Sequence, residues 1–412
     1  MSSLLGAGVT FLTQVLIARW LGVKAFGEFS SALALVTIVS PLAGFGVQAF
    51  WLKVFGEEGV GALRWVGSSL RFTLFSTLVI FILLLGWPLF AHKDEGWNLL
   101  SLVLSVHLFG IVVVELVSGR LQIEGRYGML ALWQLAPHLL RLCLFSGFFL
   151  LFSIDILAIG YIYAVVSLLF LLAGSYFLYG MINGNLRLAV SVNLPITAPY
   201  RDANINALDV FKGAWPFGAA AAFYLIYFQI AIVLLKELAG AEMAGFYNVA
   251  FLIMSAVYLF PSVVYQKFLV PKIFHWASHD KQKMHEVYLK GGRLMLAFGL
   301  LAMLGIFLAG PYMVLKVFGE QYQDSVLVLK ILALAAPMRF LSSTFSSVLT
   351  TQRLMKLKVT VMCAGAIIAI GAGILAISFW GVTGAAGTSV LVEFFLLISF
   401  YYTARNFVFK NH

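Results

Sequence analysis

Charged residues are scarce in this chain. Asp, Glu, Lys and Arg make up 11% of the 412 residues, whereas hydrophobic residues make up 62%. Soluble domains usually have about a quarter of their residues charged. The chain therefore has too little polar surface to cover a water-soluble core, and its composition requires lipid as the surrounding solvent.

Cysteine is nearly absent, and no metal-ligand set is complete. Cys143 and Cys363 are the only two cysteines, both in apolar stretches, so a disulfide framework and a CxxC redox pair are excluded. His275, His279 and His285 contain an i, i+4 spacing, but no carboxylate or cysteine close by completes a tetrahedral set. We predict a solvated helix face there, with no metal and no cofactor.

Long apolar windows recur from end to end. Each is close to the roughly 20 residues that an α-helix needs to cross a hydrocarbon core of about 30 Å. The first is interpreted as a membrane helix, because it lacks the basic start and the cleavage site of a signal peptide. The sequence thus predicts an all-α integral membrane protein with twelve transmembrane helices, at residues 2–20, 27–51, 69–91, 98–118, 129–152, 156–180, 208–235, 244–266, 289–312, 325–349, 358–380 and 384–404.

The 27 Lys and Arg residues are distributed unevenly between the two sides. With both termini in the cytoplasm, that side collects nineteen of them and the opposite side five, while Arg141, Lys330 and Arg339 fall inside helices. Positive residues favour the cytoplasmic side. The net charge of +10 is therefore a topology signal, and it does not imply a nucleic-acid partner.

An internal repeat links the two halves. A shift of 218 places Gly22 on Gly240 and Gly27 on Gly245, and it also pairs Phe29 with Tyr247, Ala32 with Ala250 and Gln48 with Gln266. A second shift, near 227, sets residues 124–130 on 351–357. Each match falls between corresponding helices, so we expect two six-helix bundles arranged as parallel repeats about an axis along the membrane normal.

The predicted domains follow from this repeat. Residues 1–182 form an N-terminal lobe, 183–206 a polar cytoplasmic linker and 207–412 a C-terminal lobe. Two such lobes predict a V-shaped transporter with a central cleft. The basic, amphipathic connection 272–290 is expected to lie as a helix against anionic lipid headgroups.

Few ionisable residues lie at bilayer depth, where each costs about 2.5–3.5 kcal/mol and requires a partner or a water-filled cavity. Gln134, His138 and Arg141 share one face of the fifth predicted helix, with Pro137 between them. A rise of about 1.5 Å per residue places Arg141 and Arg339 near the midplane.

Candidate partners differ between the two halves. His107 is expected at a depth similar to Arg141, and Glu115 closer to the cytoplasmic end. Arg339 has an acid, Glu393, at equal depth, so a structural ion pair and a substrate-binding role are both open for it. For Arg141, which lacks an acid at its depth, we favour a role in a cavity.

Further candidates for contact with a substrate are polar or aromatic. Tyr224, Tyr227 and Gln229 on the seventh helix could contact sugar rings, although packing is the commoner role of an aromatic side chain. Arg19, at the outer end of the first helix, is either a snorkelling anchor or an anion contact.

Several stretches carry a resemblance to a known family. IARWLGVKAFGEFSSALALVTIVSPLAGFG (17–46), residues 211–250 and residues 315–358 resemble the polysaccharide transporter family. That family includes the Wzx-type O-antigen (lipid-linked oligosaccharide) flippases of the multidrug/oligosaccharidyl-lipid/polysaccharide (MOP) superfamily. The similar positions are diffuse glycines, prolines and arginines, without a catalytic signature.

The resemblance implies a non-enzymatic flippase in the bacterial inner membrane. Its substrate would be an undecaprenyl-pyrophosphate-linked oligosaccharide, moved from the cytoplasmic to the periplasmic leaflet by alternating access. The implied partners are this lipid-linked oligosaccharide, the bilayer and polysaccharide assembly proteins. Arginine suits the pyrophosphate because its planar guanidinium can donate two hydrogen bonds to it.

Three other functions remain possible. A cation-coupled multidrug exporter of the multidrug and toxic compound extrusion (MATE) type would need acids at mid-depth in the first and seventh helices, which have none. A membrane-embedded polysaccharide polymerase or ligase would need a substantial periplasmic loop, whereas the predicted periplasmic connections are short. A purely structural membrane subunit would leave the midplane arginines without a role.

Cysteine labelling tests the predicted topology. Cysteines introduced at positions 187, 201, 281 and 356 should react with a membrane-impermeant reagent only from the cytoplasm, and those at 94 and 320 only from outside, because Lys and Arg favour the cytoplasmic side. Reversed labelling at two or more sites would contradict the orientation and the assigned direction of transport.

Overall fold

The computed structural model describes residues 2–90, 95–151, 155–186, 188, 205–265, 281–349 and 354–407. Over these residues the chain is helical and contains no strand. Each of the twelve predicted spans falls mainly on helix. Residues 187, 189–204, 266–280 and 350–353 lie outside the described residues, and with them much of the predicted linker, Gln266, His275 and His279.

The first two predicted helices differ from the prediction in two ways: they are joined into one long helix, and the end of the second is split off as a separate helix. α1 spans Ser2–Gly44 and joins the first two predicted helices, with a non-helical residue only at Gly22. Positive φ angles at Phe45 and Gly46 then end it before α2, Val47–Glu58. The short 3₁₀ helix η1, Gly59–Ala62, leads into α3, Leu63–Phe90.

The remaining helices of the N-terminal half follow the prediction more closely. The fourth predicted span is divided into α4, Glu95–Ser105, and α5, His107–Ile123. α6 spans Tyr127–Leu151 and continues through Pro137. α7, Ile156–Ile182, begins with Asp155, whose side chain accepts a hydrogen bond from the Ile156 backbone N–H, as N-cap residues do.

The C-terminal half has the same kind of interruptions. Its elements are α8 (Ala207–Ala239), α9 (Ala241–Ser262), α11 (Lys281–Met313), η3 (Val314–Phe318), η4 (Glu320–Tyr322), α12 (Ser325–Ala333), α13 (Ala335–Val348) and α14 (Met355–Phe407). α12 and α13 are bent by 40°. α14 joins the last two predicted spans across Gly381, whose φ of 54° is outside the helical region. Residues 281–290, expected within an interfacial helix, are the first turns of α11.

Several helices are long and apolar enough to cross a membrane. Among the described residues, eight helical stretches qualify as spans, or nine if the bent pair α12 and α13 counts as one. The longest, Leu4–Trp87, has 84 residues. At 1.5 Å per residue it would extend over about 126 Å, several times the hydrocarbon core, so it must cross more than once. The chain is a multi-pass membrane protein, and the count of twelve stays a prediction.

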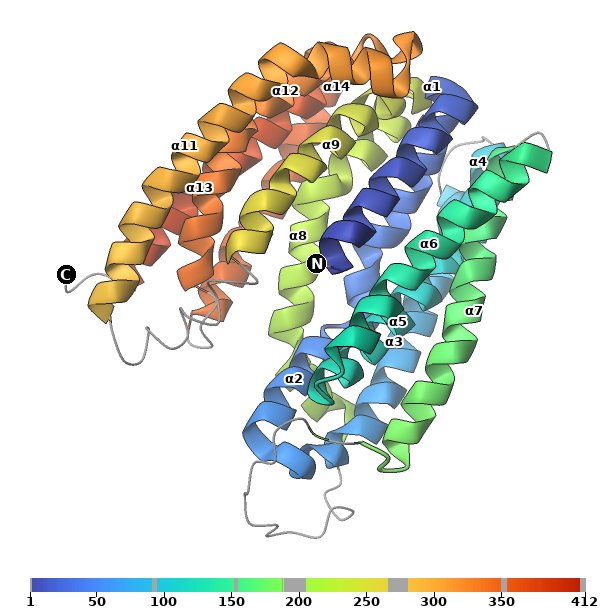
Figure 1. The fold of residues 1–412 in the computed structure, drawn as a ribbon, viewed down its shortest axis with the longest axis vertical. Coiled ribbons are helices and arrows are strands. Elements are labelled where there is room, and N and C mark those ends of the chain that lie inside the picture. The colour runs from blue at the N-terminus through green and yellow to red at the C-terminus, as the bar shows by residue number, and fades with distance from the viewer. Residues whose placement is uncertain are drawn as a thin grey trace. The chain divides into compact units, whose positions relative to one another are not determined.

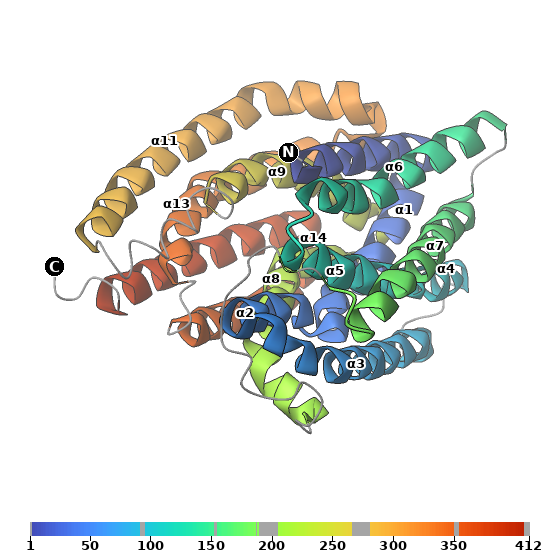
Figure 2. The same cartoon turned by 60° about the horizontal axis from the view of Figure 1, so that its bottom comes forward.

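The chain forms two compact units. Unit 1 comprises residues 1–13 and 35–222, and unit 2 comprises 14–34 and 223–412. In unit 1, α7 packs on α4, α5 and α6 (Figures 1 and 2). In unit 2, α13 packs on α11 and α14, and α12 packs on α9. The predicted lobes 1–182 and 207–412 stay a prediction.

Within unit 2 the two copies of the repeated glycine segment meet. A Cβ at Gly27 would lie 1.7 Å from the Ala241 carbonyl oxygen, and a Cβ at Gly245 would lie 2.3 Å from that of Val23. These contacts are reciprocal, because adding 218 to 27 and 23 gives 245 and 241. Asn248, the counterpart of Ser30, donates a 2.7 Å hydrogen bond to it. Reciprocal contacts of this kind are what a local two-fold axis between the copies produces.

A buried arginine fixes the end of α7. Arg120 on α5 donates from Nε to Glu124 at 2.8 Å and from Nη2 to the Asn185 carbonyl oxygen at 2.8 Å. It also donates to the Phe177 carbonyl oxygen. The sequence showed Arg120 only as part of the positive cytoplasmic side, whereas in the structure its charge is paired and buried.

The glycine contact can be tested by adding one methyl group. Gly27→Ala should lower the thermal midpoint of the purified protein, because the methyl group has no space beside Ala241 and overpacking costs about 1–3 kcal/mol. Gly8→Ala is the matched control on α1, since nothing lies within 4 Å of its Cβ position. Equal midpoints for both variants would contradict the close contact.

Candidate functional site

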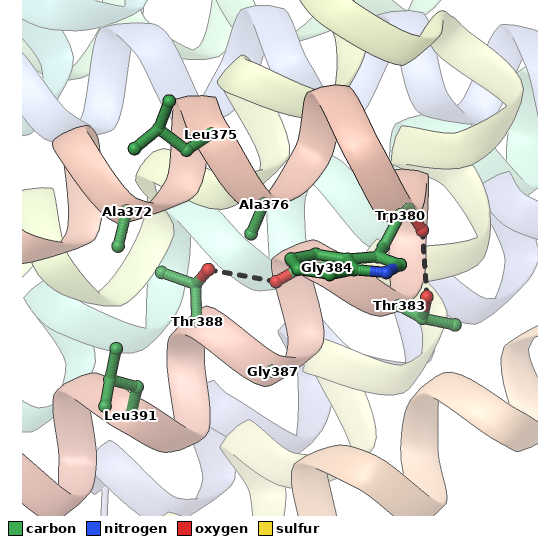
Figure 3. A pocket seen from close by; sticks show the side chains of 9 residues that line it. All are labelled: Ala372, Leu375, Ala376, Trp380, Thr383, Gly384, Gly387, Thr388 and Leu391. Atoms are coloured by element: carbon green, nitrogen blue, oxygen red, sulfur yellow. Dashed lines mark hydrogen bonds between the residues drawn. The ribbon is translucent and has the colours of Figure 1, made fainter.

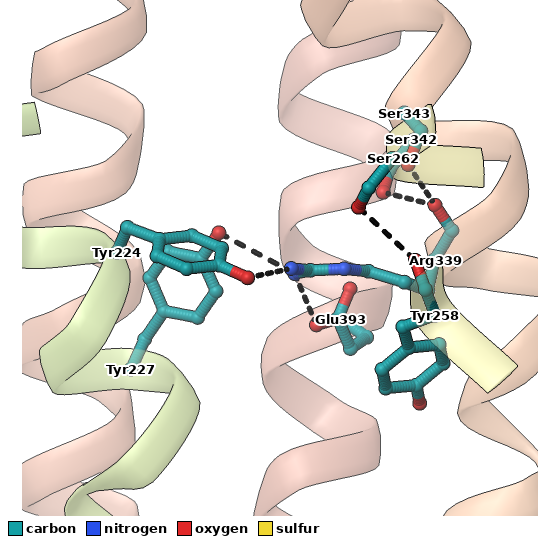
Figure 4. Close-up of polar contacts among 8 residues, drawn as sticks. All are labelled: Tyr224, Tyr227, Tyr258, Ser262, Arg339, Ser342, Ser343 and Glu393. Carbon is teal, nitrogen blue, oxygen red and sulfur yellow. Dashed lines mark hydrogen bonds and ion pairs between the residues drawn. The ribbon is translucent and has the colours of Figure 1, made fainter. Parts of the chain in front are cut away.

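Arg339 lies on α13 inside a cluster of aromatic side chains. Its guanidinium carbon is 5.1–5.9 Å from the ring centroids of Tyr224, Tyr227, Phe228 and Tyr258. Nη2 donates to the Tyr224 hydroxyl at 3.0 Å, and Nη1 lies 3.4 Å from the Tyr227 hydroxyl. Figure 4 shows both hydroxyls directed at the guanidinium. Cation–π contacts of this kind are stronger away from water.

The same guanidinium forms a buried ion pair. Nη1 of Arg339 donates to Oε1 of Glu393 at 2.8 Å, and both residues are buried (Figure 4). Oε2 of Glu393 is buried without a hydrogen-bond partner. The structural ion pair that the sequence left open for Arg339 is therefore present, and the acid neutralises this cation.

The other candidates that belong to unit 2 have separate surroundings. Tyr224 and Tyr227 hold Arg339 through their hydroxyls, while Gln229, two residues further on α8, is half-buried. Arg19 belongs to unit 2 and donates to the Lys316 carbonyl oxygen at 3.2 Å. These positions favour packing and anchoring, and a contact with substrate stays a prediction.

Among the residues that the structure describes, no carboxylate pairs with Arg141 on α6. Its side chain is buried, and its Nε has no hydrogen-bond partner. The guanidinium carbon lies 4.5 Å from the ring centroid of Tyr163 on α7, and Nη2 lies 3.4 Å from Nδ1 of His107 on α5. The structure thus brings Arg141 together with a histidine, as expected from depth. A buried cation without an acid is expensive in a membrane.

Two histidines next to Arg141 are held by hydroxyl groups. Nδ1 of His107 lies 2.7 Å from the Ser167 Oγ on α7, and Nδ1 of His138 lies 2.9 Å from the Thr10 Oγ1 on α1. Each hydroxyl also donates to the carbonyl oxygen four residues before it, at 2.6 Å for Ser167 and 2.8 Å for Thr10. These contacts fix the orientations of both imidazole rings.

Arg141, His107 and His138 line one cavity of unit 1. It has a volume of about 360 Å³ and is bordered by α2, α5 and α6. All the predicted polar candidates that belong to unit 1 contribute to it, including Glu115 and Gln134, and Gln134 lies 3.4 Å from the Ser118 hydroxyl. The wall consists of Gln48, His107, Gly110, Ile111, Val114, Glu115, Ser118, Gln134, Pro137, His138 and Arg141.

The sequence did not identify every residue of this site. Thr10, Tyr163 and Ser167 contact the cluster from α1 and α7, and Gln48 borders the cavity from α2. Helix packing brings them beside Arg141, and their positions in the sequence do not indicate it. The sequence indicates only that these polar residues lie at a similar depth in the membrane, and depth alone does not show which of them contact Arg141.

A second hollow, on α14, has a different character. It has a volume of about 390 Å³ and lies along both sides of the break at Gly381. Figure 3 shows small residues such as Ala376 and Gly387 beside the Trp380 indole, and the Thr388 hydroxyl donates to its own helix. None of the nine lining residues is ionisable, so this hollow does not fit a charged ligand.

No group of three or more His, Cys, Asp or Glu able to hold a metal ion occurs among the described residues. Both cysteines are free thiols. The imidazoles and the guanidinium of unit 1 could instead bind an anion, because guanidinium N–H groups and protonated imidazoles donate charge-assisted hydrogen bonds.

The fold is similar to that of solved membrane transporters, two of which are named as members of the MOP superfamily. An inward-facing multidrug-resistance MATE transporter matches with a TM-score of 0.71 at 14% identity, over 98% of this chain and 94% of the other. The lipid II flippase MurJ, in an inward closed conformation, matches with a TM-score of 0.73 at 14% identity, over 98% and 86%.

A third similar structure is a MOP superfamily transporter from Pyrococcus furiosus. It matches with a TM-score of 0.64 at 15% identity, over 98% of this chain and 93% of that one. The reverse polarity of its binding pocket is described as suggesting a different function. At these identities the three structures show the fold.

Sequence comparison shows the family. The model of the family described as polysaccharide biosynthesis protein matches residues 1–276. The chain therefore belongs to this family, as its resemblance to polysaccharide transporters predicted. No curated protein sequence matches the chain.

The buried ion pair predicts a specific pattern of stability. Arg339→Ala should reduce the amount of folded protein in the membrane, because removing one partner of a buried pair costs about 3–5 kcal/mol. Adding Glu393→Ala should restore part of it, since no unpaired charge then remains. Size-exclusion chromatography of the fluorescently tagged protein in detergent measures the folded amount of each variant.

The exposed pair Arg64–Glu58, with side chains 40% and 29% exposed, provides the control. Arg64→Ala should change the folded amount little, because exposed pairs contribute about 0–1 kcal/mol. A normal yield from the single variant Arg339→Ala would show that the pair is not structural.

Proposed function

We propose that the chain is a flippase for an undecaprenyl-pyrophosphate-linked oligosaccharide, such as an O-antigen repeat unit. It moves this substrate from the cytoplasmic to the periplasmic leaflet of the bacterial inner membrane by alternating access, with both termini in the cytoplasm. Family membership supports this proposal, as does the transporter fold. Polysaccharide assembly proteins would supply and consume the substrate.

The observation that carries the proposal is the uncompensated charge of Arg141. A diphosphate cannot enter hydrocarbon unaided, because desolvating an ion costs several kcal/mol even after relaxation. Arg141 can replace part of its hydration, since its buried Nε has no partner and its cavity is lined by polar side chains. Arginine also donates two parallel hydrogen bonds to a phosphate group.

The same observation distinguishes the two arginines. The charge of Arg339 is neutralised by Glu393 at 2.8 Å, so binding an anion there would require breaking that pair. We therefore assign headgroup binding to Arg141 together with His138 and Gln134, and a structural role to Arg339. The cation of Arg141 also disfavours the cationic drugs of a multidrug exporter at this site, because like charges repel.

Export of the glycan tests this assignment. Arg141→Ala should abolish delivery of lipid-linked glycan to the cell surface while the protein still inserts, because the diphosphate loses its fixed cation. Arg141→Lys should restore it only in part, since lysine lacks the planar two-donor group. Surface glycan is measured per folded protein in a host that lacks its own flippase and makes the matching lipid-linked glycan.

The control is Arg126→Ala. Arg126 is also an arginine of unit 1, but its side chain is 52% exposed and pairs at 3.4 Å with Glu124. This variant should export at the normal level. Normal export from Arg141→Ala would rule out the proposed site.

A further inference from the structure

The cluster around Arg141 contains two imidazoles whose proton positions can be inferred. Thr10 and Ser167 each have one hydroxyl proton, and each donates it to a carbonyl oxygen of its own helix. Their oxygens can then only accept from the imidazoles, at 2.9 Å and 2.7 Å. This pattern favours the tautomer with the proton on Nδ1 in both histidines, which leaves Nε2 as the atom that can take a further proton.

This assignment also affects Arg141. The Nδ1 of His107 cannot accept from Nη2 of Arg141, 3.4 Å away, because it already carries a proton. With Nε also unpartnered, the guanidinium keeps donors available for an anion. A second positive charge beside it is repelled while the site is empty, so both imidazoles are neutral in that state.

The charge of the proposed substrate requires more than Arg141. A diphosphate that carries a prenyl chain on one side and a sugar on the other has two ionised oxygens and a charge of −2. Arg141 supplies +1 and leaves −1 unbalanced in a buried site, which is costly. One protonated imidazole restores neutrality.

The other ionisable groups around the site do not supply this charge. The ring centroid of Tyr163 on α7 lies 4.5 Å from the guanidinium carbon of Arg141 and 5.2 Å from the ring centroid of His107, but a phenol cannot carry a positive charge. Glu115 is the one carboxyl group in the cavity wall. It lies eight residues beyond His107 on α5, about 12 Å along the helix, and a carboxyl group cannot supply a positive charge. The wall residue from α2, Gln48, is not ionisable.

We propose that one proton is taken up by the pair His107 and His138 when the diphosphate headgroup binds, an inference that rests on the proposed function. The proton enters at an imidazole Nε2 when the anion arrives and leaves when the anion is released. The headgroup would then cross as a charge-balanced complex with Arg141 and one imidazolium, and binding would tighten as the pH falls.

Proton uptake can be measured directly by calorimetry. The probe is a ten-carbon prenyl diphospho-N-acetylglucosamine, titrated into the purified protein at one pH in buffers of different ionisation enthalpy. The wild type should take up close to one proton per bound probe near neutral pH. Its affinity should rise by up to about tenfold for each unit by which the pH is lowered, as expected for one linked proton.

Variants locate the proton. The double variant His107→Asn/His138→Asn should bind the probe more weakly and without proton uptake, because Asn can still donate to each hydroxyl but does not titrate. Glu115→Gln should keep the uptake of the wild type. Loss of uptake in Glu115→Gln, or full uptake in the double variant, would overturn the proposal.

The wild type alone also decides the question if the double variant does not fold. Binding with no proton uptake would overturn the coupling and leave the proposed anion site intact. Equal binding, or equal absence of binding, in the wild type and in Arg141→Ala would overturn the anion site itself, and the coupling with it.

Discussion

The cost of an ionised group in hydrocarbon constrains this molecule more than any other interaction. Each buried charge must have a partner or a polar cavity. Arg339 has Glu393 and two tyrosine hydroxyls, and Arg120 has Glu124 and backbone carbonyl oxygens. Arg141 has histidines, a tyrosine ring and a cavity. This difference separates structural arginines from the one that we assign to substrate.

Much of the fold followed from the sequence because apolar length and charge asymmetry are direct consequences of the bilayer. The predicted spans fall mainly on helix, and the repeated glycines Gly27 and Gly245 contact each other. Helix continuity was not predictable in the same way. Gly22 and Gly381 interrupt α1 and α14 at single residues, whereas Pro137 leaves α6 continuous. Whether a glycine or proline interrupts a helix depends on the packing around it.

The candidate site was predicted less completely. Helical spacing placed Gln134, His138 and Arg141 on one face, and estimated depth placed His107 near them, and all four line one cavity. Depth also indicated Glu393 as a candidate partner of Arg339, and the structure contains this ion pair. The contacts of Thr10, Tyr163 and Ser167 depend on which helices pack together and how each is rotated, and a single sequence does not contain that information.

The central claim is that the anion-binding charge is Arg141, and a structure of the protein with bound substrate analogue tests it most directly. Cryo-electron microscopy with the ten-carbon prenyl diphospho-N-acetylglucosamine should show phosphate density within hydrogen-bond distance of the Arg141 guanidinium, with the Arg339–Glu393 pair intact. Phosphate density against Arg339, with Glu393 displaced, would contradict the account.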